Sequence, residues 1–210
     1  MRKLITAESV RRGHPDKLCD QIADRILDAH LRQDPWARVA VEVFATAGKI
    51  IIAGEVTSEA KVAYGEIAVE TVNEIGYDPA DMSGSAGDLL QVEVRVHEQS
   101  PDIAAAVDKG SELGAGDQGI MVGYATDETP EYLPLPVVLA HGLCREMDAL
   151  RGRVAWLGVD GKAQVTVAYE GDVPKAVTTV VLSAQHVKNA NWPCIRHTLM
   201  EKVVERVIPA

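Results

Sequence analysis

The sequence lacks most of what a disulfide scaffold, a zinc protein or a membrane protein needs. Its 210 residues include three cysteines, Cys19, Cys144 and Cys194, and no two of them have C-x-x-C spacing. This odd number and spacing argue against a disulfide framework and a structural zinc site. The N-terminus MRKLITAESV has no apolar signal segment, and no apolar run approaches membrane-spanning length. We therefore expect a cytoplasmic protein with reduced thiols and no membrane partner.

Basic and aromatic residues are also scarce. Lys and Arg number 21 against 31 Asp and Glu, which gives a formal net charge of −10, and no Lys/Arg cluster of the kind that binds a nucleic-acid backbone is present. Nucleic acid is therefore not an expected partner, whereas an acidic protein can still bind phosphates through a metal ion. Phe44 is the only phenylalanine, so Val, Ile, Leu and Ala carry most of an apolar fraction of 47%, which is enough for a packed core.

The pattern of apolar residues predicts two similar series of helices and strands. The expected elements are a strand at 3–7, a helix at 16–32, a hairpin at 38–56, a helix at 60–75, a strand at 88–96, a loop at 97–116, a strand at 119–125, a helix at 133–151, a hairpin of 163–169 and 175–186, and a helix at 193–207. The order β-α-β-β-α-β is thus followed by β-α-β-β-α, one strand short. This predicts an α+β fold of two-layer sandwiches, with mostly antiparallel sheets and helices on one side. The missing strand would leave a sheet edge unpaired.

The stretch GAGDQGIMVGYA fits the G-x-G-x-x-G pattern with Gly114, Gly116 and Gly119. A dinucleotide-binding loop needs a strand before these glycines and a helix after them. Here a polar loop precedes them and an alternating, strand-like stretch follows, and the carboxylate of Asp117 would repel a pyrophosphate. The glycines either let the backbone turn tightly and present Asp117 to a ligand, or form a plain turn.

The segment GHPDK places His14 and Asp16 around the N-terminus of the first helix. Helix N-termini favour anions, so an imidazole here can donate to a phosphoryl oxygen and an Asp can hold Mg²⁺. The alternative is ordinary N-cap chemistry with a histidine on the surface.

Three further charged residues are candidates. Glu42 and Glu55 lie in the otherwise apolar hairpin at 38–56, where a buried carboxylate would need a partner or a cation. The alternative is that one or both of them face solvent on the polar side of the sheet. Lys162 follows a glycine turn and precedes a strand, which suits an ammonium that binds phosphate; the alternative is a hairpin-end lysine in water.

Together these motifs resemble the S-adenosylmethionine synthetase (methionine adenosyltransferase) family. The matching segments occur in family order and cover nearly all of the chain: TAESVRRGHPDKLCDQIADRILDAHL, VEVFATAGKIIIAGEVTS, QSPDI, GAGDQGIMVGYAT, LPLPVVLAH, DGKAQVT and VVLSAQH. The resemblance implies a fold of intertwined two-layer α/β repeats. It also implies a tight homodimer with shared active sites, often paired into tetramers.

The resemblance further implies the substrates and the reaction. The thioether sulfur of L-methionine attacks C5′ of ATP and expels the triphosphate, which is then cut to phosphate and pyrophosphate. A neutral sulfur nucleophile needs no general base, so catalysis rests on positioning and on stabilising the leaving group.

Residue roles follow from the matching positions. His14 would assist the leaving O5′ as a catalytic residue together with Lys162, Asp16 would bind Mg²⁺, and Glu42 would bind K⁺. The ATP-binding residues would be His14, Asp160, Gly161 and Lys162, and the methionine-binding residues would be Glu55, Gln99 and Asp117. The implied divisions are a first domain at 1–98, a gating loop with the glycine-rich segment at 99–117, and an incomplete central domain at 118–210.

The chain also departs from the family. Members are usually near twice this length, and the part without a counterpart would carry the aromatic that stacks on adenine, a second Mg²⁺-binding acid and an Arg/Lys cluster for the triphosphate. The stretch SGSAGDLLQVEVRV and the gate also differ from the family pattern. Three explanations stay open: one half of a split enzyme whose partner chain supplies the rest, an incomplete piece of a longer protein, or an inactive paralogue that binds or regulates. The intact site residues argue against the third, and we expect the isolated chain to be inactive.

Overall fold

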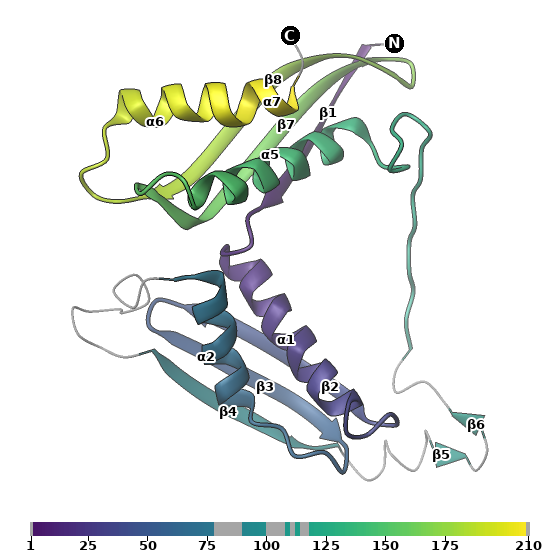
Figure 1. The fold of residues 1–210 in the computed structure, drawn as a ribbon. Coiled ribbons are helices and arrows are strands. Elements are labelled where there is room, and N and C mark those ends of the chain that lie inside the picture. The colour runs from purple at the N-terminus through teal and green to yellow at the C-terminus, as the bar shows by residue number, and fades with distance from the viewer. Residues whose placement is uncertain (1, 78–89, 100–107, 110–111, 114–117, 209–210) are drawn as a thin grey trace. The chain divides into compact units, whose positions relative to one another are not determined.

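The computed structural model describes residues 2–77, 90–99, 108–109, 112–113 and 118–208. Figure 1 labels the elements, which are in chain order β1 (Arg2–Val10), α1 (Pro15–Leu31), β2 (Arg38–Thr46), β3 (Lys49–Thr57), α2 (Tyr64–Ile75), β4 (Gln91–Glu98), β5 (Asp108–Lys109), β6 (Glu112–Leu113), α5 (Leu135–Arg151), β7 (Leu157–Glu170), β8 (Val173–His186), α6 (Trp192–Leu199), the π-helical turn η1 (Met200–Val204) and α7 (Glu205–Val207).

The chain folds into two compact units. The continuous unit comprises Leu18–Val122, and the discontinuous unit combines Met1–Lys17 with Gly123–Ala210. Each main sheet has helices on one face, so the expected α+β fold is confirmed.

In the continuous unit, the sheet has the strand order β2-β3-β4 and carries α1 and α2 on one face (Figure 1). Gly48, with φ 72°, makes the tight turn between the antiparallel strands β2 and β3. The α2 crossover then returns the chain so that β4 runs parallel to β3. On α1, Leu18, Ile22 and Ile26 recur every fourth residue and are almost wholly buried, as an amphipathic helix on a sheet requires.

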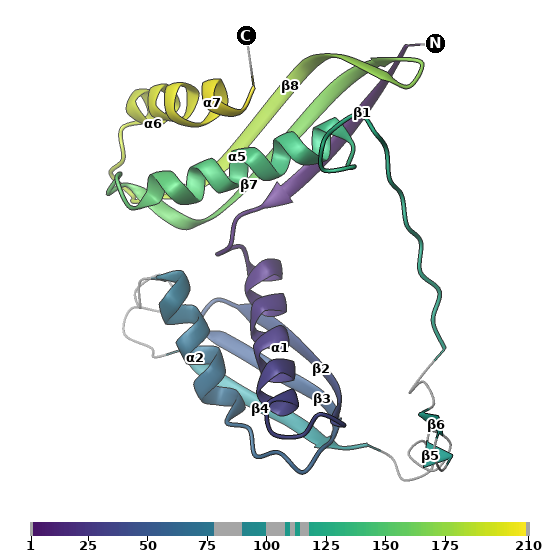
Figure 2. The same ribbon diagram turned by 45° about the vertical axis from the view of Figure 1, so that its right-hand side comes forward.

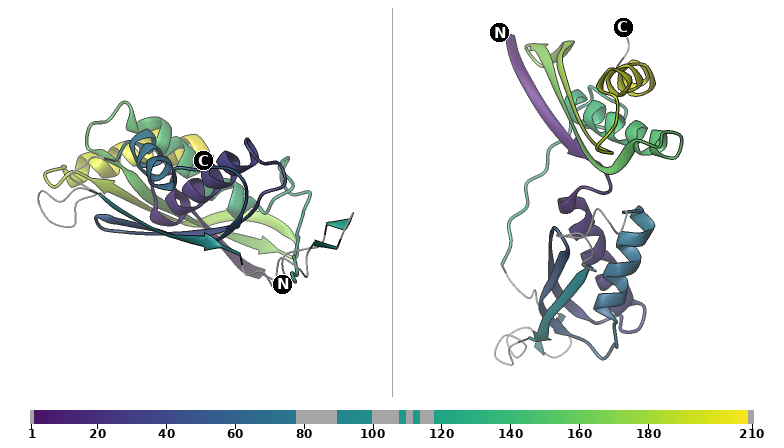
Figure 3. Two further views of the ribbon diagram at one scale, coloured as in Figure 1. Left: turned by 90° about the horizontal axis from the view of Figure 1, so that it is seen from below. Right: turned by 90° about the vertical axis from the view of Figure 1, so that its left-hand side faces the viewer.

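In the discontinuous unit, the sheet has the order β1-β7-β8, and both pairings are antiparallel. The helices α5 and α6 lie together on one side of it, as Figure 2 and the right-hand view of Figure 3 show. The apolar stripe of α5 packs onto alternate residues of β7 in a core that includes Leu143, Met147, Val165 and Val167. Asn191 caps α6 by accepting a hydrogen bond at Oδ1 from the Cys194 backbone N–H, over 3.1 Å.

The first strand is where the structure departs most from the expected order. β1 pairs with β7 along its whole length, from Arg2 opposite Glu170 to Val10 opposite Lys162, and so belongs with the second series of elements. The strand expected at 119–125 is wrong: residues 118–126 have no regular secondary structure. Alternation of apolar and polar residues predicts that a segment can form a strand, but it does not predict which strand it pairs with. In the structure, β1 is the strand that pairs with this edge of β7.

Smaller differences concern the ends of elements. The expected helix at 60–75 begins at Tyr64, and the last helix is divided into α6, η1 and α7. β7 starts at Leu157, well before the expected 163, and this added part pairs with the end of β8, with Leu157 opposite His186 and Gly161 opposite Ala184. The short strands β5 and β6 form a two-stranded pair within the segment expected to be a loop.

Candidate active site

A buried arginine joins the segment before α1 to the first half of β7. Arg11 has no exposed surface, and its Nε donates a hydrogen bond to Asp148 Oδ1 over 2.8 Å. Its Nη1 donates to the carbonyl oxygens of Gly158 and Asp160, over 2.9 and 3.2 Å. The Arg11 backbone N–H donates to Gly161 O at 2.8 Å. One side chain and one amide thus fix GHPDK against residues 158–161.

Two glycines make this close approach possible. A Cβ on Gly13 would lie 2.6 Å from Val159 Cβ and 2.7 Å from its carbonyl oxygen. A Cβ on Gly161 would lie 2.7 Å from both Arg11 Cδ and Ser183 O. Any side chain at either position would therefore push the two segments apart.

His14 sits just before α1 and faces its first turn. The backbone N–H of Asp16 donates to His14 Nδ1 over 3.3 Å, so the expected N-cap chemistry is present. With Nδ1 as acceptor, a neutral imidazole carries its proton on Nε2, which is then a donor. The side chain of His14 is one-fifth exposed, whereas that of Asp16 is 84% exposed. The cap and a role as donor to a ligand oxygen are therefore compatible.

Asp160 and Lys162 lie on the part of β7 that Arg11 holds. Lys162 stands opposite Val10 in the sheet, and its ammonium lies 3.6 Å from Glu8 Oε1, with 40% of the side chain exposed. It is thus a mid-strand lysine with an acidic neighbour, not one at the end of the hairpin. Asp160 Oδ1 is buried and has no hydrogen-bond partner among the residues that the structure describes. A buried carboxylate oxygen without a hydrogen-bond donor or a cation beside it destabilises the fold. A ligand could stabilise it, either by donating a hydrogen bond from a hydroxyl or by placing a cation next to it.

Gln185 of β8 supports the same strand from the other side. Its Oε1 accepts hydrogen bonds from the backbone N–H groups of Val159 and Asp160, over 3.0 and 3.1 Å. Sequence reasoning did not single out Arg11, Gln185 or Glu8. Arg11 and Gln185 lie inside the quoted segments that carry the family resemblance, but only their burial and partners reveal what they do.

The remaining predicted residues that can be located belong to the continuous unit. Glu55 pairs in register with His97 of β4, and its Oε1 lies 3.2 Å from His97 Nε2. Just beyond β4, Gln99 Oε1 accepts from Arg38 Nε at 3.3 Å and from Thr57 Oγ1 at 3.4 Å. A carboxylate, an imidazole and an amide therefore lie at the end of the sheet where β3 and β4 finish.

Glu42 lies on the same sheet, opposite Ala53 and diagonally across from Glu55. Both carboxylates project from the face without helices, because Ile50 and Ile52, which alternate with Ala53 and Glu55, are the fully buried positions. Glu42 is exposed, so for this residue the structure agrees with the alternative that its carboxylate faces solvent.

The predicted ATP-binding and methionine-binding residues thus lie in different units. His14, Asp16 and the segment from Asp160 to Lys162 are in the discontinuous unit, and Glu55 and Gln99 are in the continuous one. Asp117 and most of the predicted gate lie outside the described residues.

The predicted metal ligands differ in how well their surroundings suit a cation. Within the described ranges, no group of three or more His, Cys, Asp or Glu side chains gathers as a preformed metal site. The exposed Asp16 suits Mg²⁺, which typically takes one or two carboxylates together with substrate phosphates. Glu42 offers a single exposed carboxylate, which is not by itself a K⁺ site.

A small cluster of polar side chains connects β1 to α5 through hydrogen bonds. Ser9 Oγ lies 2.7 Å from His141 Nδ1, and the Cys144 thiol donates to Ser9 O over 3.3 Å. Burial lowers the pKa of His141, and the positive charges of Lys17 and Arg145 lower it further. Burial likewise raises the pKa of the Cys144 thiol. Both side chains are therefore neutral structural groups near neutral pH.

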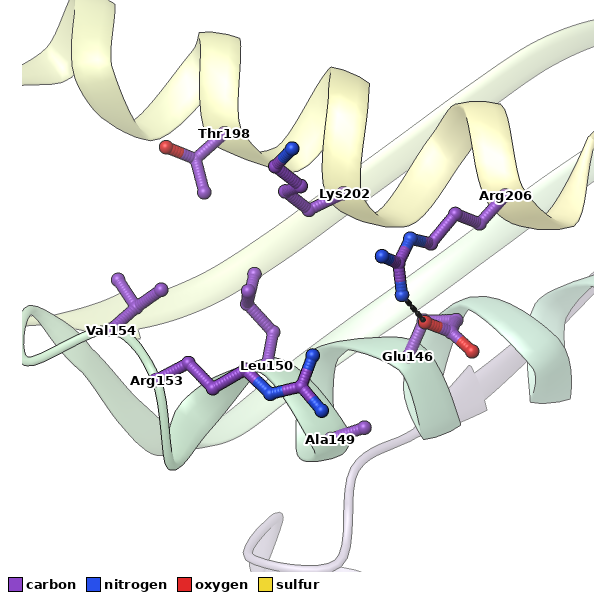
Figure 4. A pocket seen from close by; sticks show the side chains of 8 residues that line it. All are labelled: Glu146, Ala149, Leu150, Arg153, Val154, Thr198, Lys202 and Arg206. Atoms are coloured by element: carbon purple, nitrogen blue, oxygen red, sulfur yellow. Dashed lines mark hydrogen bonds and ion pairs between the residues drawn. The ribbon is translucent and has the colours of Figure 1, made fainter.

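A separate hollow lies between α5 and the helices after β8 (Figure 4). It has a volume of about 600 Å³ and contains three cationic side chains, Arg153, Lys202 and Arg206, beside an apolar floor. Arg206 is already 3.5 Å from the carboxylate of Glu146, and the C-terminal end of α5, which disfavours anions, borders the hollow. None of the predicted site residues lines it.

Among the described residues, no helix combines the length and apolar character needed to cross a bilayer.

Comparison with known proteins points to one family along almost the whole chain. Residues 2–101 match the family model of the S-adenosylmethionine synthetase N-terminal domain, and residues 112–210 match that of the central domain. The S-adenosylmethionine synthase of Leifsonia xyli subsp. xyli is 48% identical over 99% of this chain and 56% of its own length. That of Desulforudis audaxviator is also 48% identical with the same coverage, and that of Thermus thermophilus is 47% identical. The chain therefore spans about half the length of the curated relatives it matches.

Proposed function

The chain belongs to the S-adenosylmethionine synthetase family, and on this basis we propose that it takes part in making S-adenosylmethionine from ATP and L-methionine. The observation that carries the proposal is the attachment of GHPDK to residues 158–161 through Arg11, which gathers His14, Asp16, Asp160 and Lys162 in one unit. We propose cytoplasmic localisation as well.

In the proposed reaction, the methionine sulfur attacks C5′ of ATP, a new S–C bond forms, and the C5′–O5′ bond breaks. The electron pair of that bond leaves with the triphosphate, which is then hydrolysed to phosphate and pyrophosphate. The sulfur is neutral and carries no proton, so the chain needs no general base for this step. What it must supply is orientation and stabilisation of the negative charge that grows on O5′.

His14 and Lys162 are the proposed catalytic residues. His14 can donate from Nε2 to O5′ while its Nδ1 stays bonded to the first turn of α1. The Lys162 ammonium sits near Glu8, whose carboxylate keeps it oriented, and it binds the phosphates. Asp160 accepts a hydrogen bond from ATP at its unpartnered Oδ1, and Gly161 permits the close backbone packing of this strand.

Two cations belong to the proposal. Asp16 would hold Mg²⁺ together with the phosphates of ATP, and the ion neutralises part of their charge. Glu42 would contribute one ligand to a K⁺ site, with the other ligands from beyond its own sheet. Methionine would be bound by Glu55, Gln99 and Asp117, with carboxylates facing its ammonium group.

The chain matches the N-terminal and central domains and about half of each relative's length. We propose that activity also needs the portion of the family that lies outside this match, on the same polypeptide or on a second one, within a homodimer or larger oligomer. The isolated chain is then inactive.

The test is a complementation assay. The chain is mixed with ATP, L-methionine, Mg²⁺ and K⁺, alone and together with the segment that follows the matched region of the Leifsonia xyli synthase, made as a separate polypeptide. S-adenosylmethionine is measured by mass spectrometry. We expect product only in the mixture and none when the chain carries His14→Asn. Product from the chain alone would refute the need for a partner.

Titration calorimetry with methionine and with an ATP analogue separates the alternatives if no product forms. A regulatory paralogue should bind one of these ligands well by itself. Absence of product in the mixture and of binding to either ligand would overturn the proposed function.

A further inference from the structure

The strands β7 and β8 pair unevenly beside the candidate site. In their ladder, Leu157 stands opposite His186, and the next pair is Gly161 opposite Ala184. Residues 158–160 of β7 therefore face Gln185 of β8 alone, which makes them a β-bulge. Bulges bend a strand locally and redirect a side chain, and they are common next to active sites. They also interrupt the ladder, so the backbone N–H and C=O groups within the bulge need other partners.

Two side chains supply partners for Asp160, the last residue of the bulge. The Asp160 backbone N–H donates to Gln185 Oε1 over 3.1 Å, and the same oxygen accepts from the Val159 N–H over 3.0 Å. The Asp160 carbonyl oxygen accepts from Arg11 Nη1 over 3.2 Å. Side chains thus hold both backbone groups of Asp160, where a regular strand would use its neighbouring strands. The direction in which the Asp160 carboxylate points therefore depends on Gln185 and Arg11.

The Asp160 carboxylate gives this arrangement its importance. Its Oδ1 is buried and has no hydrogen-bond partner among the residues that the structure describes. A buried acceptor in this state indicates a donor on a ligand, and it serves a ligand only if the backbone that carries it is fixed. Gly158 shows how closely Gln185 fits against the bulge, because a Cβ there would lie 2.5 Å from Gln185 Oε1 and 2.6 Å from its Cδ. The amide of Gln185 is therefore packed directly against residues 158–160.

We propose that Gln185 is a positioning residue for the ATP site: its amide oxygen fixes the bulge and so aims the Asp160 carboxylate at ATP. This role rests on the proposed function and adds to it a residue that acts through Asp160. Without the Gln185 oxygen, two backbone N–H groups lose their acceptor and the carboxylate loses its fixed direction. A displacement of about 1 Å is enough to weaken a polar contact strongly. ATP should then bind less well, whereas methionine binding, proposed for residues of the continuous unit, should not change.

The test measures the binding of an ATP analogue and of methionine by calorimetry, with the chain assembled with the Leifsonia xyli segment described above. Gln185→Leu removes the acceptor, and Gly158→Ala displaces the Gln185 amide without changing its chemistry. Both should weaken binding of the ATP analogue roughly tenfold, the effect of one hydrogen bond to a charged group, and leave methionine binding unchanged. Thr178→Val is the matched control, because it removes another bond from a β8 side chain to the β7 backbone, from Thr178 Oγ1 to Thr166 O, outside the bulge. It should change neither affinity.

Asp160→Asn distinguishes a positioning role from general support of the fold. If Gln185 acts through Asp160, Gln185→Leu should weaken binding of the ATP analogue much less when Asp160→Asn is already present, because coupled residues give non-additive effects. Equal losses in the two backgrounds would overturn the positioning role. Native affinity in Gln185→Leu would overturn it as well, and both results would leave the proposed function standing.

Hydrogen–deuterium exchange tests the bulge without any ligand. The amides of Val159 and Asp160 should exchange faster in Gln185→Leu than in the native chain, and Thr178→Val should leave them unchanged. Unchanged exchange in Gln185→Leu would overturn the role of Gln185 whatever the binding data show. Faster exchange in an assembly whose native form binds no ATP analogue would support Gln185 as the residue that holds the bulge, and it would count against the proposed function.

Discussion

The Nε atom of Arg11 donates to Asp148 Oδ1 over 2.8 Å, and the arginine side chain that makes this bond is completely buried. Asp148 is on α5 and retains 27% of its side-chain exposure, so the pair joins the sheet to its covering helix at the border of the solvent. The same guanidinium holds two carbonyl groups of β7. A structural ion pair is therefore part of the scaffold for His14 and Lys162.

We expect Arg11→Met to lower the free energy of unfolding by about 3 kcal/mol, because it leaves a carboxylate and two carbonyl groups without their donor. Urea denaturation followed by circular dichroism measures this. Arg12→Met is the matched control, since Arg12 is the exposed neighbour, and it should change stability by roughly 0.5 kcal/mol or less. Equal effects of the two substitutions would contradict the role of burial.

Gly13→Ala should separate GHPDK from β7. The new methyl group would lie 2.6–2.8 Å from Val159 atoms that include its backbone, so the segment must move. We expect a loss of about 1–3 kcal/mol of stability and weaker binding of an ATP analogue, measured by denaturation and calorimetry. Gly152→Ala, whose methyl group would meet nothing within 4 Å, should leave both unchanged. A stable Gly13→Ala variant with normal binding would show that this packing is dispensable.

Lys162→Met should weaken the binding of a Mg²⁺–ATP analogue by about tenfold, the effect of one charge-assisted hydrogen bond. The fold should be retained, because the ammonium group is at the surface with 40% of its side chain exposed. Lys175→Met, on the exposed part of β8, serves as the charge-matched control. Calorimetry on the assembled protein compares the two. An equal loss from both would indicate general electrostatic attraction instead of a contact at Lys162.

Acid should destabilise the continuous unit through His30. Its ring is 1% exposed, and its Nε2 lies 2.9 Å from Tyr64 Oη. Burial lowers its pKa below the ordinary 6.5, against the opposing charge of Asp34. The unfolded chain therefore binds the proton more readily, so this stabilisation is complete above the ordinary pKa and falls as the pH drops through 6.5 toward the folded-state value.

The free energy of unfolding of the native chain and of His30→Gln, measured between about pH 5 and pH 8, checks this prediction. The native chain should lose more stability toward acid than the variant. The comparison is needed because the pKa of His141 is lowered too, and this histidine gives a slope of the same sign in both proteins. Parallel curves would exclude His30 as a source of the pH dependence.

Local pattern sufficed for most helices and for the two hairpins. The apolar spacing of Leu18, Ile22 and Ile26 predicts α1, and the alternation around Gly48 predicts the β2–β3 hairpin, because both depend on neighbours a few residues away. The helix expected at 133–151, which the structure has at Leu135–Arg151, follows in the same way from its apolar spacing. The sequence likewise indicated His14, Asp16 and Lys162 as candidate site residues, because each is a charged or titratable side chain next to a turn or at the start of a helix.

By itself, then, the sequence determined the α+β class, the repeated helix–hairpin–helix series and the family, because these depend on short patterns and motif order. Only the tertiary structure decided that β1 joins β7, that Arg11 is buried against Asp148, and that Glu55 meets His97. Strand partners and buried ion pairs join residues far apart in the chain. Their free energies depend on which surfaces meet, and no local periodicity encodes that.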